Sequence, residues 1–101
     1  MFDVRITVLK KTEQADLIEE YGMDGLSVCD RFEDNEVIIS KHGGRPEGFC
    51  EEAWSAVGKY AFALAHGADG FWDSWIPERK IAIVSCNDGL RPVIFRMETV
   101  E

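Results

Sequence analysis

The sequence predicts a single α+β domain over residues 1–101, with a small mixed or antiparallel sheet of about four strands, one long helix and one short helix. Residues 2–9 alternate between apolar and polar side chains, which is typical of a half-buried strand. Residues 49–66 carry apolar side chains at helical spacing. Near the C-terminus, two strand-like segments flank the turn former Asn87-Asp88-Gly89. A chain of 101 residues has the size of one domain.

The first half of the chain predicts the order strand, helix, strand. The apolar face of the first strand consists of Phe2, Val4, Ile6 and Val8. Thr12 is expected to cap a short helix over 13–21 that ends at Gly22. The apolar stripe of this helix consists of Leu17, Ile18 and Tyr21. Turn-forming residues predict an irregular segment over 22–35, and a short second strand follows over 36–40.

The second half begins with a glycine-rich loop and a long helix over 49–66. Glu51 and Glu52 lie in its first turn, where the helix dipole favours negative charge. Gly67 is the expected C-terminal cap. The apolar stripe includes Trp54, Val57, Ala61 and Leu64. Gly58 lies inside this helix, where a glycine costs about 1 kcal/mol of stability relative to alanine. We expect Gly58 to allow close approach of another backbone, which gives a reason for a glycine at this position.

Two strands over 80–86 and 92–100 complete the domain. The first of them has apolar residues on both faces, which indicates a central strand of the sheet. The turn signal between them predicts a hairpin whose loop is slightly longer than the tightest type. The order of elements is therefore strand, helix, strand, helix, strand, strand.

Charge and composition exclude several classes of partner. The net charge of −8 disfavours nucleic acid and anionic membrane surfaces, because both are negatively charged. No apolar run approaches the roughly 20 residues that span a bilayer. The N-terminus enters an alternating pattern at once, unlike a signal peptide, so we expect a cytoplasmic protein. A chain this small is marginally stable alone, which favours a homo-oligomer.

The three cysteines are the first candidates for chemistry. Cys29, Cys50 and Cys86 are odd in number, so they cannot form a closed disulfide framework within one chain. If their segments converge, three thiolates could bind Zn²⁺ or an iron–sulfur centre, with His42 or His66 as a fourth ligand. The alternative is that Cys50 and Cys86 are small buried hydrophobic residues, since free cysteine is often buried.

Two loops provide polar candidates. Arg45 lies in the loop Gly43–Gly48, which leads into a helix N-terminus, an arrangement that binds anions. The loop lacks the Gly-Lys-Ser/Thr ending of a phosphate-binding loop, and the nearby glutamates would repel a phosphate, which favours the alternative of a flexible turn. Asp88 and Arg91 could pair with each other or place a carboxylate in a cleft. The alternative for this segment is a structural hairpin turn.

Aromatic residues provide the remaining candidates. Trp72 and Trp75 lie in a loop, where they could line a ligand pocket, form an interface or fold back on the core. Phe62 falls on the more polar side of the long helix, which indicates a subunit contact. His66 is expected to place a favourable charge at the C-terminal end of that helix.

Three segments carry a family resemblance. They are Val4-x-Ile6-Thr7-Val8-Leu9-Lys10, then Pro46-Glu47-Gly48-Phe49-Cys50 with Ala53-Trp54, and Cys86-x-Asp88-Gly89-Leu90-Arg91-Pro92-Val93-x-Phe95. Together they resemble a small uncharacterised prokaryotic protein family of about this length. The resemblance implies a stand-alone domain with all three cysteines at motif positions, and it supplies no activity. Asp30 stands where that family has a proline after its first cysteine.

These observations favour a small cytoplasmic binding or interaction domain without its own catalysis. One alternative is a thiol-ligated metal or redox protein that uses Cys29, Cys50 and Cys86. A second alternative is a small enzyme with a pocket between the loops 43–48 and 71–75. The identity of a small-molecule ligand does not follow from the sequence.

Overall fold

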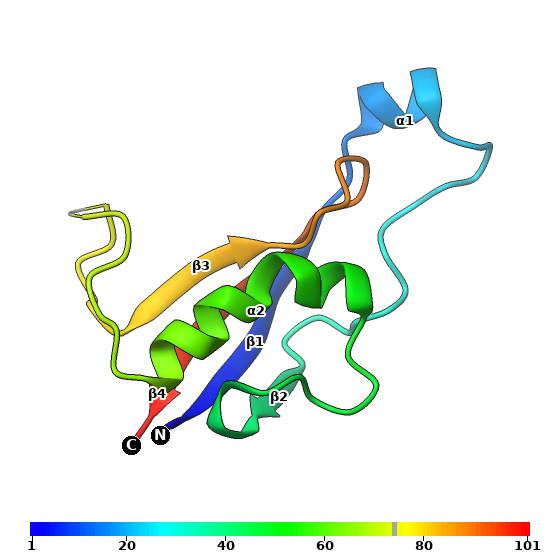
Figure 1. Cartoon of the computed structure of the whole chain (residues 1–101). Helices are drawn as coiled ribbons and strands as arrows, with labels where there is room; N and C mark the ends of the chain where they lie inside the picture. The colour runs from blue at the N-terminus through cyan, green and yellow to red at the C-terminus, as the bar shows by residue number, and fades with distance from the viewer. Residues whose placement is uncertain (74) are drawn as a thin grey trace.

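The computed structural model describes residues 1–73 and 75–101. It confirms the α+β prediction, with a four-stranded antiparallel sheet in the order β2-β1-β4-β3 and a long helix across one face (Figure 1). The strands are β1 (Asp3–Lys11), β2 (Val37–Ser40), β3 (Ile81–Ser85) and β4 (Val93–Val100). The helices are α1 (Ala15–Tyr21), the short 3₁₀ turn η1 (Lys41–Gly43) and α2 (Glu51–Ala65).

The two longest strands, β1 and β4, form the centre of the sheet. Their register runs from Asp3 opposite Val100 to Lys11 opposite Val93, with an irregularity between Val8 and Lys10. Side chains alternate across a strand, so paired residues on one face form a continuous apolar layer. The fully buried members of this layer are Val4, Ile6, Val8, Val93, Phe95 and Met97. The two chain termini consequently lie side by side (Figure 1).

Helix α2 covers this apolar layer. Its buried residues are Ala53, Val57, Ala61, Leu64 and Ala65. The predicted stripe is confirmed except at Trp54, which is half-buried and packs edge-on against Phe49 with ring centroids 5.5 Å apart. Cys50 is the N-cap, His66 is the C-cap, and Gly67 follows at φ +89°. Left-handed glycines commonly terminate helices in this way.

The close backbone approach predicted at Gly58 was wrong. A Cβ atom at Gly58 would meet the indole of Trp54, at 2.9 Å, so this glycine makes room for a side chain of its own helix. The close backbone contact occurs at Gly43, where a Cβ atom would lie 3.0 Å from the carbonyl oxygen of Ala61. Gly43 also has φ +82°, a conformation that favours glycine. It therefore sets how closely η1 packs on α2.

The prediction that the strand over 80–86 is central was wrong, because β3 forms an edge of the sheet. Its second apolar row faces away from α2, where no helix of the described chain covers the sheet. We call this surface the open face. It includes Asp3, Arg5, Thr7, Lys10, Val37, Ile39, Ile81, Ile83, Ile94, Arg96 and Glu98, which the strand registers place on one side of the sheet. The apolar row on this uncovered face therefore gives β3 the sequence pattern that is typical of a central strand.

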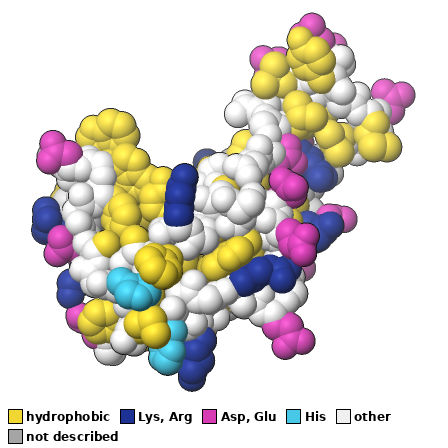
Figure 2. Space-filling view, in the orientation of Figure 1, with side chains coloured by type: hydrophobic (Ala, Val, Ile, Leu, Met, Phe, Trp, Pro, Cys, Tyr) yellow, Lys and Arg dark blue, Asp and Glu magenta, His cyan; other side chains and the backbone are white. Residues whose placement is uncertain are grey.

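The short helix also differs from its prediction. It begins at Ala15 instead of residue 13, and Thr12 does not cap it, because the Thr12 hydroxyl donates to the Pro92 carbonyl oxygen at 2.7 Å. None of its residues is buried, and α1 projects beyond the end of the sheet (Figures 1 and 2).

Among the described residues, no helix combines the length and apolar composition needed to cross a membrane.

The packing of α2 on the sheet can be tested at Leu64, which is fully buried. We expect Leu64→Ala to reduce the free energy of unfolding by about 2–5 kcal/mol, because it leaves a cavity in the core. The matched control is Phe62→Ala in the same helix, where the side chain is 62% exposed and the change should stay within about 0.5 kcal/mol. Urea denaturation measures both, and equal losses in the two variants would contradict this packing.

Candidate functional site

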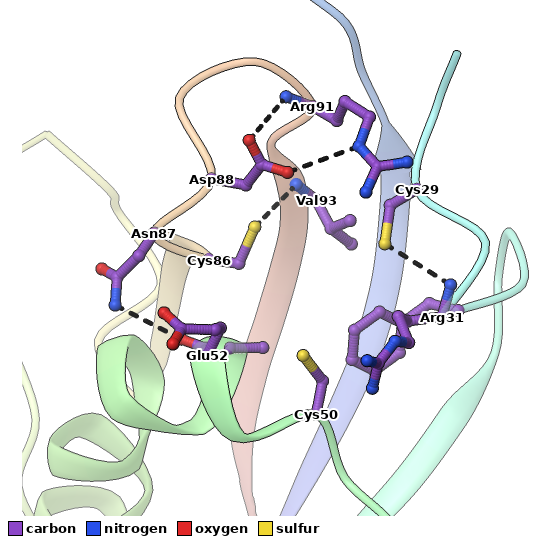
Figure 3. Close-up of a pocket in the computed structure, with 11 residues that line it drawn as sticks. Cys29, Arg31, Cys50, Glu52, Cys86, Asn87, Asp88, Arg91 and Val93 are labelled. Atoms are coloured by element: carbon purple, nitrogen blue, oxygen red, sulfur yellow. Dashed lines mark hydrogen bonds and ion pairs between the residues drawn. The ribbon is translucent and has the colours of Figure 1, made fainter. Parts of the chain in front are cut away.

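A pocket of about 320 Å³ lies at the N-terminal end of α2 (Figure 3). Three parts of the chain surround it: the irregular segment before β2, the start of α2 and the loop between β3 and β4. Its lining residues are Cys29, Arg31, Phe32, Cys50, Glu52, Ala53, Cys86, Asn87, Asp88, Arg91 and Val93. The pocket therefore joins segments that are far apart in the sequence.

All three cysteines line this pocket. Cys50 is the N-cap of α2, Cys86 follows the end of β3, and Cys29 lies in the irregular segment. Their sulfur atoms point toward the space between these elements (Figure 3). All are free thiols that are only partly buried. Cys50 and Cys86 both pack, partly buried, against the edge of the core, so the alternative that they are small hydrophobic packing residues remains compatible with their positions.

Two of the sulfurs accept backbone hydrogen bonds. The Arg31 N–H donates to Cys29 Sγ at 3.4 Å, and the Val93 N–H donates to Cys86 Sγ at 3.3 Å. Cys50 makes no side-chain cap, so its sulfur stays free to face the pocket. Hydrogen bonds to sulfur are a common feature around cysteine ligands, whose position and reactivity they adjust.

The loop between β3 and β4 is held by the carboxylate of Asp88. Asp88 Oδ1 accepts the backbone N–H groups of Leu90 at 2.8 Å and Arg91 at 3.1 Å, and Oδ2 accepts Arg91 Nε at 3.4 Å. Burial alone raises the pKa of Asp88, but these two backbone donors and the guanidinium outweigh it and lower the pKa below its ordinary value. The hairpin and the local Asp88–Arg91 ion pair predicted from the sequence are both present.

Further contacts attach this loop to the rest of the pocket. Asn87 Nδ2 donates to Ser55 Oγ at 2.7 Å and to the Glu52 carbonyl oxygen at 3.3 Å, which joins the loop to α2. Arg91 Nη1 reaches the Ser27 carbonyl oxygen at 3.4 Å, close in sequence to Cys29. The loop thus links the two other walls of the pocket.

The remaining candidates lie elsewhere. Arg45 donates to the Phe49 carbonyl oxygen at 2.5 Å and lines a separate, shallow pocket. Trp72 packs on Tyr60, and Trp75 is 80% exposed. His42 lies beside Asp3, where its ring nitrogen is 3.9 Å from the carboxylate.

His66 lies at the opposite end of α2 from Cys50 and stacks on Phe62. Neither His66 nor His42 lines the pocket, so neither is placed to complete the shell of the three cysteines. Within residues 1–73 and 75–101, no three Cys, His, Asp or Glu side chains are grouped closely enough to share one metal ion.

None of the three pockets described here is lined by both of the loops 43–48 and 71–75. The pocket that includes Trp72 is completed by α2 and β3, and the pocket that includes Arg45 is completed by α2 and Arg31. The first loop lies beside β2 and the second beside β3, at opposite edges of the sheet (Figure 1). Ser74, inside the second loop, lies outside the described residues.

Sequence reasoning missed Arg31, Glu52 and Asn87. Arg31 and Asn87 each lie within two positions of a pocket cysteine, and that proximity is the signal that would have found them. The sequence places Glu52 in the first turn of the helix, but it does not predict that the Glu52 carbonyl oxygen accepts a hydrogen bond from Asn87 in the neighbouring loop.

Comparison with known proteins found no match: no family model, no curated protein and no solved structure is similar to this chain. The description of the site therefore depends on its own residues.

Asp88 allows a test of the loop by pH. Because its pKa is lower in the folded chain than the ordinary 3.8, its ionised form stabilises the fold above that value and loses this effect as the pH falls through the folded pKa. We expect wild type to be more stable than Asp88→Asn at pH 7, with a difference that shrinks below pH 3.8. Urea denaturation across this range measures it, and a difference independent of pH would contradict the assignment.

Proposed function

We propose that this chain is a cytoplasmic binding domain whose pocket holds an iron–sulfur cluster through Cys29, Cys50 and Cys86. The observation that carries the proposal is the convergence of three free thiols, from three separate segments, on one pocket. Cysteine thiolates are the usual ligands of such clusters. A reducing compartment keeps the thiols available, which supports the cytoplasm as the location.

A single ion and a cluster differ in how far apart they hold their cysteine ligands. A tetrahedral zinc ion holds each cysteine sulfur at about 2.3 Å, which requires the sulfurs to be tightly grouped. No such group exists among the described residues. A cluster places several iron and sulfide atoms between its cysteines, so it bridges ligands that are further apart. The pocket volume of about 320 Å³ leaves space for a group of that kind.

The polar surroundings support a negatively charged group. Arg31 and Arg91 line the pocket together with Glu52 and Asp88, and Arg91 is already paired with Asp88 at 3.4 Å. Arg31 is therefore the cation that we expect to attract the charge of the thiolates. The backbone donors to Cys29 and Cys86 serve the same purpose. Asp88 directs its oxygens to its own loop, so it competes little with the sulfurs as a ligand.

Three cysteines also define what the cluster could do. A four-iron cluster normally takes four cysteine ligands, so a site with three leaves one iron with an open position. Such an iron can bind a small molecule directly. This fits a binding role, and the nature of the small molecule is a question for experiments on the loaded protein.

The test is anaerobic purification without chelators, followed by iron and sulfide analysis and an absorption spectrum. We expect about four iron and four sulfide per chain, and near-complete loss of iron in each of Cys29→Ser, Cys50→Ser and Cys86→Ser, because an incomplete shell binds weakly. Glu51→Gln is the matched control, since it adjoins Cys50 without lining the pocket and should retain iron.

Iron-free wild-type protein after anaerobic reconstitution would overturn the cluster. Stoichiometric zinc that depends on all three cysteines would replace it with a single-ion site. Thermal unfolding of each apo variant separates loss of the ligand from loss of the fold.

A further inference from the structure

The segment 13–28, which we call the arm, carries several exposed apolar side chains. It contains α1, in which no residue is buried, and it projects away from the sheet with hydrophobic and acidic side chains on its surface (Figure 2). Tyr21 is 72% exposed and Met23 is 73% exposed. Exposed apolar groups gathered in this way mark an interaction surface.

The arm is held in place at both ends, although its surface is uncovered. The Gln14 N–H donates to the Leu90 carbonyl oxygen at 2.8 Å, and Arg91 reaches the Ser27 carbonyl oxygen at 3.4 Å. Ile18 and Leu26 lie together beside Gly22, which gives the arm a small core of its own. A segment that is already fixed loses less conformational entropy on binding than a disordered one.

The charge of the arm restricts what can cover it. Residues 13–28 contain five acidic residues and no Lys or Arg. Two arms packed on each other would therefore bring like charges together, which is unfavourable. A surface that covers the arm must be apolar and positively charged, although the chain as a whole is negatively charged.

The open face of the sheet has both properties. Ile81, Ile83 and Ile94 form one apolar side, and Val37 and Ile39 form the other, with the last two 55% and 48% exposed. Between them, Arg5 is paired with Glu98 at 2.7 Å. Arg96 Nε lies 3.6 Å from Glu98 Oε2, so the Glu98 carboxylate pairs with both arginines.

The register also places Lys10 on this face, opposite Ile94. The cations on this face are Arg5, Lys10 and Arg96, and the carboxylates are Asp3 and Glu98. The Asp3 carboxylate already accepts a hydrogen bond from the backbone N–H of His42. The face has an excess of positive charge in a chain of net charge −8.

From this complementarity we infer that the chain forms a homodimer in which the arm of each copy lies on the open face of the other. Apolar residues of the arm, including Leu17 and Tyr21, cover the isoleucines, and its carboxylates face Arg5 and Arg96. The exchange is reciprocal, so it closes at two copies. This contact is independent of the proposed cluster, and it uses a different surface from Phe62 and Trp75.

The experiment combines sedimentation equilibrium with mixing of variants of the full-length chain. Leu17→Glu alters the arm, and Ile83→Glu alters the open face at the position paired with Arg96. We expect wild type to be a dimer at about 100 µM. Each variant alone should have a dimer dissociation constant at least tenfold higher. An equimolar mixture of the two variants should form a heterodimer, because one intact arm meets one intact open face. Phe62→Glu is the control that should remain dimeric.

Several results would overturn the inference. They are a monomeric wild type, dimers that survive both Leu17→Glu and Ile83→Glu, a dimer lost in Phe62→Glu, or a mixture with no tighter association than either variant alone. The last result would indicate arm–arm or face–face contact. Val37→Glu on the opposite side of the open face provides a second test if Ile83→Glu fails to fold, as monitored by circular dichroism.

Discussion

Antiparallel pairing of β1 with β4 fixes the position of nearly every other element. These strands run side by side from Asp3 opposite Val100 to Lys11 opposite Val93. One end of the pair carries both chain termini, and the other end carries the two segments that leave the sheet. The β3–β4 loop begins and ends there, and the arm starts where Thr12 bonds to Pro92. The pocket forms at this second end because the N-terminus of α2 lies beside it.

The segments that line the pocket differ in the contacts that fix their positions. Cys86 lies in a loop whose shape Asp88 maintains, and Asn87 joins that loop to α2. Cys29 belongs to a segment without regular structure, and its anchor is the nearby Phe32. That ring is buried and packs edge-on against Phe49 and Phe95, with centroid distances of 5.2 and 5.1 Å. The aromatic contact therefore brings the first cysteine to the other two.

The sequence allowed the fold class and most elements to be predicted, because strand alternation and helical spacing reflect burial directly. The failures have physical causes. Ile81 and Ile83 gave β3 the pattern of a central strand, since a pattern of apolar residues does not reveal whether a sheet face is covered. The apolar residues of α1 suggested a packed helix, although none is buried within the chain. Both errors arise where an apolar surface lacks a partner in the same chain.

The convergence of the cysteines was one of two alternatives in the sequence, and local patterns could not decide between them. The position of Cys29 depends on a contact between Phe32 and residues distant in the chain, which no spacing rule encodes. Arg31 and Asn87 were missed for a related reason, because their roles come from neighbours across the pocket. Residues in regular elements were thus predictable, and residues in the loops that build the site were not.

The central claim is that three cysteines from separate segments hold one polynuclear centre. Iron K-edge X-ray absorption of anaerobically prepared protein tests this claim most directly, because it reports the neighbours of the metal itself. We expect a shell of sulfur atoms around iron together with an iron–iron shell. Iron surrounded by oxygen or nitrogen without a neighbouring iron would contradict it.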